Sequence, residues 1–161
     1  SLGIAPGDPL PFEKLDAMPL TEMAFKEAMR MKPPVPSIPR RATRDFSFKG
    51  YDIPAGTLVS MNPLFTHHMS EHWPDPETFD PLRFTDEAQR ARHRFAFIPF
   101  SGGAHMCIGL HFARLLFTSL YAELLSQYRI EFQKPGYFPT KVQNLPFAKP
   151  TDGLPVRLVP R

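Results

Sequence analysis

The sequence predicts a mixed α+β chain in which two main helices are combined with small antiparallel β-sheets. Apolar residues recur at three- and four-residue spacing over residues 20–31 and again over residues 108–126, as they do in amphipathic helices. Between these stretches, short runs alternate apolar and polar residues, which is typical of half-buried strands. The 20 prolines are spread along the 161 residues, and this distribution favours short elements joined by rigid turns.

Length and composition indicate a single globular unit. A chain of 161 residues, with 42% hydrophobic and 22% charged residues, can bury one core of its own. The net charge of only +3 and the absence of a dense Lys/Arg run argue against nucleic acid as a partner. Cys107 is the one cysteine, so an internal disulfide is excluded. No apolar run reaches the length of a membrane span, and we expect a cytoplasmic protein.

The first main helix is predicted over residues 20–31, after a short helical stretch at residues 11–17. Pro19 suits the first turn of the main helix. Pro33 and Pro34 end it, because a residue that precedes proline is disfavoured in the helical conformation. The apolar face of this helix is formed by Leu20, Met23, Ala24, Phe25, Ala28 and Met29.

Three short strands are predicted next, and we expect them to form one small antiparallel sheet. Residues 45–48 alternate polar and aromatic side chains, which indicates a half-buried strand. Lys49 and Gly50 form a two-residue hairpin turn into a second strand at residues 51–53. A third strand is predicted at residues 57–61.

The rest of the chain is expected to contain an irregular stretch, one long helix and then, at residues 128–161, short strands and turns. Residues 73–100 are rich in prolines and aromatic residues at irregular spacing, so this segment is expected to be ordered without regular structure. Residues 108–126 form the second main helix, with leucine and phenylalanine at helical spacing. Residues 155–159 are predicted to form a strand.

Cys107 is the main candidate for chemistry, because it lies between a glycine-containing loop and the start of the second main helix. The free N–H groups of a helix N-terminus favour an anion, here a thiolate. A thiolate can ligate haem iron and promote O–O cleavage. Gly103 and Gly109 flank the cysteine, and residues without a side chain allow a close approach to a flat macrocycle. By spacing alone, a lone cysteine before a helix is more often an inert thiol.

The run Phe-Ser-Gly-Gly-Ala-His-Met-Cys-Ile-Gly at residues 100–109 resembles the haem loop of the cytochrome P450 family, Phe-x-x-Gly-x-(Arg/His)-x-Cys-x-Gly. Two other segments match the family in the expected order. Glu-Ala-Met-Arg at residues 27–30 is similar to its Glu-x-x-Arg, and Pro-Leu-Arg-Phe at residues 81–84 is similar to its Pro-x-Arg-Phe. The resemblance covers the chain from about residue 15 to the end, and the sequence looks bacterial.

The resemblance implies a haem cofactor, haem b, with Cys107 as the axial ligand of the iron. Arg40 falls where the family places an arginine that binds a haem propionate. His105 occupies a second propionate-binding position, where the family more often has arginine. The residues that the resemblance assigns to cofactor binding are Arg40, Phe100, Gly103, His105, Cys107 and Gly109.

Glu27, Arg30 and Arg83 form a second candidate group. Glu27 and Arg30 are neighbours on the first main helix, three residues apart. By spacing alone, such a pair is usually a solvated surface ion pair that contributes little stability. The resemblance implies instead a buried triad with Arg83 behind the haem loop, and we assign this triad to folding and haem retention.

The resemblance implies a haem-thiolate monooxygenase that inserts one oxygen atom of O₂ into a small apolar organic substrate. Two electrons would come from a ferredoxin or a reductase on the proximal face. The family's oxygen-activating segment, (Ala/Gly)-Gly-x-(Asp/Glu)-Thr, does not occur in the sequence, so we assign no catalytic residue. We therefore expect residues 1–161 to be the C-terminal haem-binding part of a single cytochrome P450 domain, and to be inactive alone.

Other interpretations remain open. A non-oxygenase haem-thiolate protein would share the same loop. A zinc-stabilised binding module would use histidine and cysteine pairs at a spacing of four residues, such as His68 with His72 or Cys107 with His111. The basic residues at positions 90–94 fit either a solvated loop or a docking surface for an acidic electron-transfer partner. By position, residues 35–39 and 144–147 are expected to contact substrate.

Overall fold

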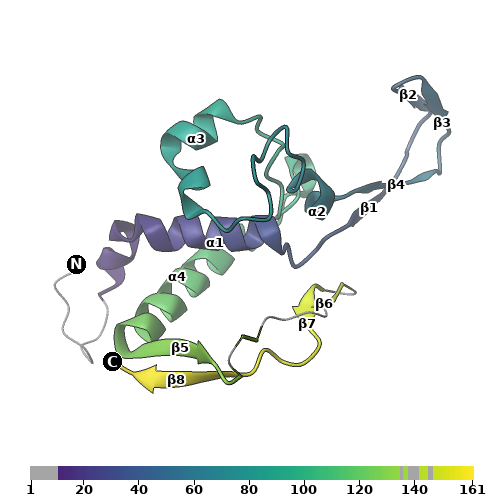
Figure 1. Cartoon of the computed structure of the whole chain (residues 1–161). Helices are drawn as coiled ribbons and strands as arrows, with labels where there is room; N and C mark the ends of the chain where they lie inside the picture. Colours follow the sequence, from purple (N-terminus) through teal and green to yellow (C-terminus); the bar gives the residue numbers. More distant parts are fainter. Residues whose placement is uncertain (1–10, 135, 138–141, 145–146) are drawn as a thin grey trace.

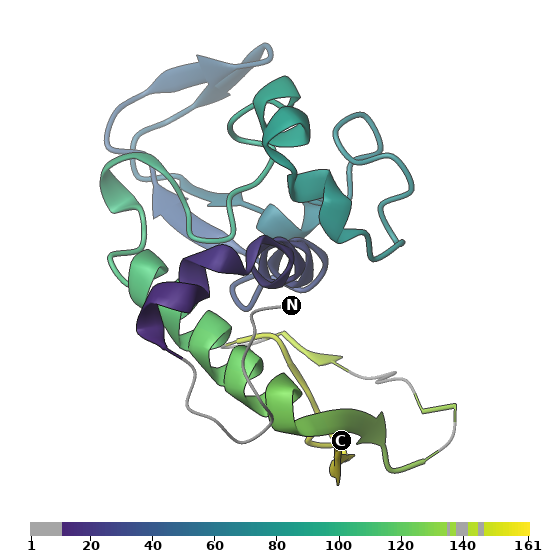
Figure 2. The same ribbon diagram turned by 90° about the vertical axis from the view of Figure 1, so that its left-hand side faces the viewer.

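Two long helices, α1 (Pro19–Met31) and α4 (Leu110–Gln127), cross and contact each other at the centre of the structure (Figures 1 and 2). The computed structural model describes residues 11–134, 136–137, 142–144 and 147–161. Both main helices lie within two residues of their predicted bounds, so these predictions are confirmed. The predicted fold class, two main helices with small antiparallel sheets, is also confirmed. None of the helices in the described ranges is long and apolar enough to cross a membrane.

Several short helical segments connect the main elements, and side chains cap most of them. They are η1 (Phe12–Ala17), α2 (Pro63–Thr66), η2 (Pro81–Phe84), α3 (Asp86–Ala91) and η3 (Gly103–His105). The side chains of Asn62, Asp80 and Thr85 accept hydrogen bonds from the first turns of α2, η2 and α3. Such caps satisfy backbone N–H groups that have no partner inside a helix.

The expectation of one three-stranded sheet between the main helices is wrong. β2 (Phe46–Phe48) and β3 (Tyr51–Ile53) form the predicted hairpin, but β4 (Leu58–Met61) pairs with an unpredicted strand, β1 (Ile38–Arg41). The Asp45 carboxylate accepts a hydrogen bond from the Ala55 N–H at 2.7 Å, closing the chain below the hairpin. The hairpin therefore projects as an arm (Figure 1).

The C-terminal region forms two further two-stranded sheets beside α4. β5 (Tyr128–Phe132) pairs antiparallel with β8 (Val156–Pro160), and β6 (Val142–Gln143) pairs with β7 (Lys149–Pro150). The strand predicted at residues 155–159 is thus present, displaced by one residue. These sheets lie on the side of α1 opposite to α3 (Figure 2).

The buried core is small and aromatic. Trp73, Phe84 and Ala96 are at most 2% exposed, and Met23 of α1 and Phe97 pack against them. The ring centroids of Trp73 and Phe84 are 5.7 Å apart, and those of Phe84 and Phe97 are 4.8 Å apart. The segment at residues 73–100 is therefore ordered by its own aromatic side chains, as the sequence predicts. The expectation that it lacks regular structure is wrong, because η2 and α3 lie within it, each capped by a side chain.

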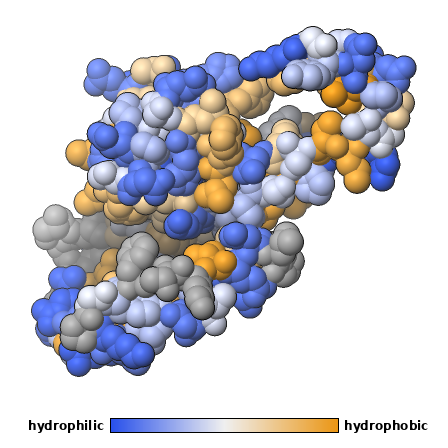
Figure 3. Space-filling model, turned by 45° about the vertical axis from the view of Figure 1, so that its right-hand side comes forward, coloured by the Kyte–Doolittle hydropathy of each residue, from blue (hydrophilic) through white to orange (hydrophobic). Residues whose placement is uncertain are grey.

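Much apolar surface lies outside this core. The chain exposes 11693 Å² in total, whereas a compact monomer of 18.3 kDa exposes about 8,100 Å². Figure 3 shows apolar side chains on the arm that carries β2 and β3 and along the boundary between the upper and lower parts of the molecule. Exposed apolar residues of α4 are Phe112, Leu115, Leu116, Leu120 and Leu125.

Candidate functional site

The cysteine loop is closed by its own backbone. The Cys107 N–H donates to the Phe100 carbonyl oxygen at 2.9 Å, and the Met106 N–H donates to that of Gly103 at 3.2 Å. The thiol-bearing residue is exposed. Cys107 precedes the long helix, as the sequence predicts. The helix begins at Leu110, three residues after the cysteine, and not at residue 108 as expected.

Cys107 lines a hollow of about 320 Å³. Four of the six predicted cofactor-binding residues, Arg40, Phe100, His105 and Cys107, come together in its wall, although Arg40 lies 61 residues before Ser101 in sequence. Arg40 is oriented by two hydrogen bonds, from Nη1 to the Pro39 carbonyl oxygen at 2.9 Å and from Nη2 to the Ser101 hydroxyl at 3.2 Å. The other lining residues are Met29, Pro34, Val35, Ile38, Pro99 and Ser101.

The two remaining predicted residues, Gly103 and Gly109, differ in what the structure requires of them. Gly103 has φ +67°, a conformation that favours glycine, and a Cβ added there would meet nothing within 4 Å. A Cβ at Gly109 would meet the Cys107 sulfur at 3.7 Å, an ordinary contact. Backbone conformation explains Gly103, while the close approach of a macrocycle at Gly109 stays a prediction.

The donor set of this hollow fits a haem. Apolar side chains of Val35, Ile38 and Phe100 offer contact to a flat hydrophobic ring. Arg40 and His105 supply cationic or hydrogen-bonding groups of the kind that bind carboxylates. Cys107 supplies the sulfur that haem iron accepts as an axial ligand. Among the described residues, no three histidine, cysteine, aspartate or glutamate side chains lie close enough together to hold a bare metal ion.

Glu27 and Arg30 form a fully buried ion pair on α1, both 0% exposed. Arg30 Nε donates to Glu27 Oε2 at 2.7 Å, and Arg30 Nη2 donates to Glu27 Oε1 at 2.9 Å. The Arg30 guanidinium also donates to the carbonyl oxygens of His67 at 2.9 Å and Pro76 at 2.7 Å. The Asp80 N–H adds a further hydrogen bond to Glu27, at 2.9 Å. A buried pair with this many partners avoids the cost of unpaired charge.

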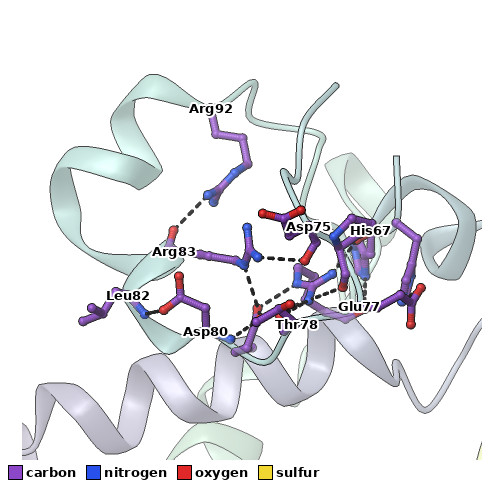
Figure 4. Close-up of polar contacts among 12 residues, drawn as sticks. His67, Asp75, Glu77, Thr78, Asp80, Leu82, Arg83 and Arg92 are labelled. Carbon is purple, nitrogen blue, oxygen red and sulfur yellow. Dashed lines mark hydrogen bonds and ion pairs between the residues drawn. The ribbon is translucent and has the colours of Figure 1, made fainter. Parts of the chain in front are cut away.

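Arg83 completes the predicted triad less tightly (Figure 4). Its Nε lies 3.5 Å from Glu27 Oε1, and its side chain is 11% exposed. This contact is too long for a good hydrogen bond, and the buried Nε has no hydrogen-bond partner in the described structure. The Arg83 Nη2 donates instead to the Asp75 carbonyl oxygen at 2.9 Å. The three side chains therefore meet, with Arg83 held mainly by charge and by the backbone of Asp75.

Arg92, one of the basic residues at positions 90–94, is half-buried and makes specific contacts within the chain. Its guanidinium lies 3.9 Å from the centre of the Trp73 ring and donates to the Arg83 carbonyl oxygen at 2.9 Å (Figure 4). Burial, and then the neighbouring charge of Arg83, lowers the pKa of Arg92. Arg90, His93 and Arg94 are exposed, and for them a solvated loop and a docking surface both remain open.

His67 is a buried polar residue that the sequence gives no reason to single out. It is 0% exposed and lies 5.3 Å from the Phe97 ring, measured between ring centres. Its hydrogen-bond partners, Arg30 and Ile98, are 37 and 31 residues away in sequence. No spacing signal could have shown these contacts, because spacing arguments reach only about one helical turn.

The histidine pairs proposed for zinc do not share a helix face. α2 ends at Thr66, so His68 and His72 lie in the turns that follow it. His68 Nδ1 contacts the Leu64 carbonyl oxygen at 2.8 Å, while His72 Nε2 lies 3.3 Å from Glu71. Cys107 precedes the first residue of α4, so it shares no helix face with His111.

Of the two segments expected to contact substrate, one lies at the hollow. Val35 and Ile38, from the stretch at residues 35–39, are in its wall. The stretch at residues 144–147 lies partly outside the described residues. Contact of either segment with a substrate stays a prediction.

The family assignment follows from comparison with known proteins. The family model for cytochrome P450 matches residues 4–156. The chain belongs to the cytochrome P450 family. A putative cytochrome P450 136 from Mycobacterium tuberculosis is 39% identical over 155 residues, which are 95% of this chain and 31% of that protein. A taurochenodeoxycholic 6 alpha-hydroxylase from Sus scrofa is 39% identical over 140 residues, 86% of this chain and 27% of that protein.

Solved P450 structures show the same arrangement of elements. A cyanobacterial CYP120A1 with retinoic acid bound has a TM-score of 0.86 and 35% identity, and covers 94% of this chain. The haem domain of cytochrome P450DA has a TM-score of 0.89 and 27% identity, and covers 98% of this chain. This chain spans about a third of the length of these relatives, 31% of the mycobacterial protein and 35% of each solved chain. It therefore has the fold of a portion of a P450.

Proposed function

We propose that this chain supplies the proximal side of the haem site in a haem-thiolate monooxygenase. The observation that carries the proposal is the hollow in which Cys107, Arg40 and His105 meet among apolar side chains. The large exposed surface and the uncovered apolar face of α4 support a role within a longer P450 domain, because monomers rarely expose such areas. Bound haem would supply oxygen activation, with an axial thiolate favouring O–O cleavage.

Cys107 would hold the iron through its sulfur. The hydrogen bond from its N–H to the Phe100 carbonyl oxygen joins the two ends of the loop and holds the backbone of Cys107 at the hollow. Its exposure in this chain leaves the sulfur accessible from the side on which the cofactor would lie. Phe100 packs toward α1, with its ring centre 6.5 Å from that of Phe25, which anchors the loop to the scaffold.

Arg40 and His105 would bind the propionates of haem b. Arg40 is already oriented by the Ser101 hydroxyl and the Pro39 carbonyl oxygen. Charge-assisted hydrogen bonds to carboxylates are stronger than neutral ones, so both residues would contribute to haem retention. Neither residue moves a proton in this proposal, and the chain contributes no catalytic acid or base.

The substrate in this proposal is a small apolar organic molecule. The apolar residues Val35 and Ile38 at the hollow favour such a ligand, and one solved relative has retinoic acid bound. Electrons would arrive from a ferredoxin or a reductase, with exposed Arg90 and Arg94 offering cationic contacts. The hydroxylase among the relatives favours oxygen insertion over a non-oxygenase haem-thiolate function.

Carbon monoxide difference spectroscopy tests the proposal. The full-length protein that carries this chain, loaded with haem and reduced, should show the strongly red-shifted Soret band of thiolate ligation. The Cys107→Ser variant should lose that band, while Met106→Leu, a change at an exposed position of the same loop, should retain it. A Cys107→Ser protein that keeps the band would overturn the ligand assignment. Oxygen-dependent formation of a product then separates a monooxygenase from a non-oxygenase haem protein.

A further inference from the structure

The buried imidazole of His67 has no part in the function proposed above. Its Nε2 lies 2.9 Å from the backbone nitrogen of Ile98, and its Nδ1 lies 3.2 Å from the Arg30 carbonyl oxygen. The ring thus touches two segments that are far apart in sequence, the end of α1 and the chain that enters the Cys107 loop.

The two contacts determine the tautomer of the ring. A backbone N–H can only donate, so Nε2 must accept from Ile98 and the neutral ring carries its hydrogen on Nδ1. That hydrogen is donated to the Arg30 carbonyl oxygen. Arg30 Nη1 donates back to the His67 carbonyl oxygen at 2.9 Å. Burial is the main cause that lowers the pKa of His67 to about 4, in agreement with a neutral ring.

The Ile98 contact continues into the cysteine loop. The Ser101 N–H donates to the Ile98 carbonyl oxygen at 3.1 Å, and the Ser101 hydroxyl accepts from Arg40. The Phe100 carbonyl oxygen accepts from the Cys107 N–H at 2.9 Å. The Ile98 backbone, which His67 holds, is therefore hydrogen-bonded at the point where the chain enters the loop that carries the sulfur.

We propose that His67 is a positioning residue for the Cys107 loop, which it joins to the Glu27–Arg30 pair by accepting from the Ile98 N–H and donating to the Arg30 carbonyl oxygen. The inference rests on the proposed function, because loop position matters for ligation only if Cys107 holds haem iron. Without the Nε2 acceptor, the Ile98 amide loses its partner and the loop can shift relative to α1. Bound haem would then divide between thiolate-ligated and misligated forms.

Two substitutions test the contacts of the two ring nitrogens separately. In His67→Gln the side-chain oxygen can reach the Nε2 position and accept from Ile98, while the contact with Arg30 is lost. In His67→Asn the side-chain amide can reach the Nδ1 position and donate to Arg30, while the contact with Ile98 is lost. His68→Gln is a matched control, because His68 contacts the Leu64 carbonyl oxygen within its own segment.

The readout is the share of bound haem that shows the thiolate band in the reduced carbon monoxide complex of the full-length protein. We expect the ratio of misligated to thiolate-ligated haem in His67→Gln and His68→Gln to equal that of the parent. In His67→Asn this ratio should rise about tenfold, because a buried amide is left unpaired. Equal ratios in all variants would overturn the inference. So would equal damage in His67→Gln and His67→Asn, including failure of both to fold or to bind haem. A parent protein without the thiolate band would instead refute the proposed function.

Discussion

The ion-pair cluster around Glu27 and the hollow at Cys107 both adjoin α1, yet they differ in completeness. Glu27 and Arg30 are fully buried, and their charged groups have several partners within the chain. Cys107, His105 and their neighbour Ile108 are exposed. The chain thus satisfies the ion-pair cluster by itself and leaves the residues at the hollow exposed. This difference is why we propose that the cluster stabilises the fold, and that the hollow is completed by a cofactor and by further protein.

The largest expected effect is at the cluster. Glu27→Gln keeps the size of the side chain but removes the charge that compensates Arg30 and Arg83, so we expect a loss of about 3–5 kcal/mol in the free energy of unfolding. Haem incorporation should fall together with stability. Chemical denaturation of the full-length protein measures the change, and Glu22→Gln on the half-exposed face of α1 is the control. A stable, fully loaded Glu27→Gln protein would contradict a role in folding.

The second prediction concerns pH and His67. Because the pKa of His67 is lowered from 6.5 to about 4 in the folded chain, the unfolded chain takes up the proton first as the pH falls. The contribution of His67 to the free energy of unfolding is therefore full above about pH 6.5 and is lost as the pH falls toward 4. Between about pH 7 and pH 5 the His67 contribution should fall by about 2 kcal/mol. Denaturation curves at the two pH values should show this decrease in the parent and lose this part of it in His67→Gln.

A smaller effect is expected at Arg92. Its stacking on Trp73 and its hydrogen bond to the Arg83 carbonyl oxygen predict that Arg92→Ala costs about 1–2 kcal/mol of stability. Arg90→Ala, a change of the same kind at an exposed position, should stay within about 0.5 kcal/mol. Thermal melts of both variants measure the difference. Equal melting temperatures would mean that the contacts of Arg92 contribute no more to stability than an exposed arginine does.

The mildest change is predicted on the open side, at His105. His105→Ala should weaken haem retention and leave thiolate ligation intact, because the residue is exposed and is assigned to a propionate rather than to the iron. The rate of haem transfer to an excess of a haem-binding acceptor protein measures retention. Loss of the thiolate band with haem still bound would contradict the propionate assignment.

The sequence predicts what depends on local spacing. The turn at Lys49 and Gly50, with φ of 50° and 83°, and the adjacent positions of Glu27 and Arg30 are local features, and both are as predicted. The pairing of β1 with β4 and the contact of Arg40 with Ser101 are not local. Such contacts depend on how the chain returns to itself through irregular segments, and neither hydrophobic periodicity nor turn chemistry carries that information.

Burial also separates the predictable from the unpredictable part of the site. Cys107 and His105 were identified through a resemblance in a continuous loop, which needs no knowledge of packing. His67 and Arg92 have sequence neighbours that are also histidine or arginine, so nothing local shows that His67 is buried or that Arg92 packs on Trp73. Only the position of Trp73 and Phe97 in the folded chain shows this.

In our proposal, this chain builds one side of a haem site and requires further protein for the other. Expression of the 161 residues alone, followed by addition of haem and an electron source, tests it most directly. We predict an association-prone protein with no oxygen-dependent product, because the apolar face of α4 stays uncovered. A soluble monomer with a cooperative melt and substrate turnover would contradict the account.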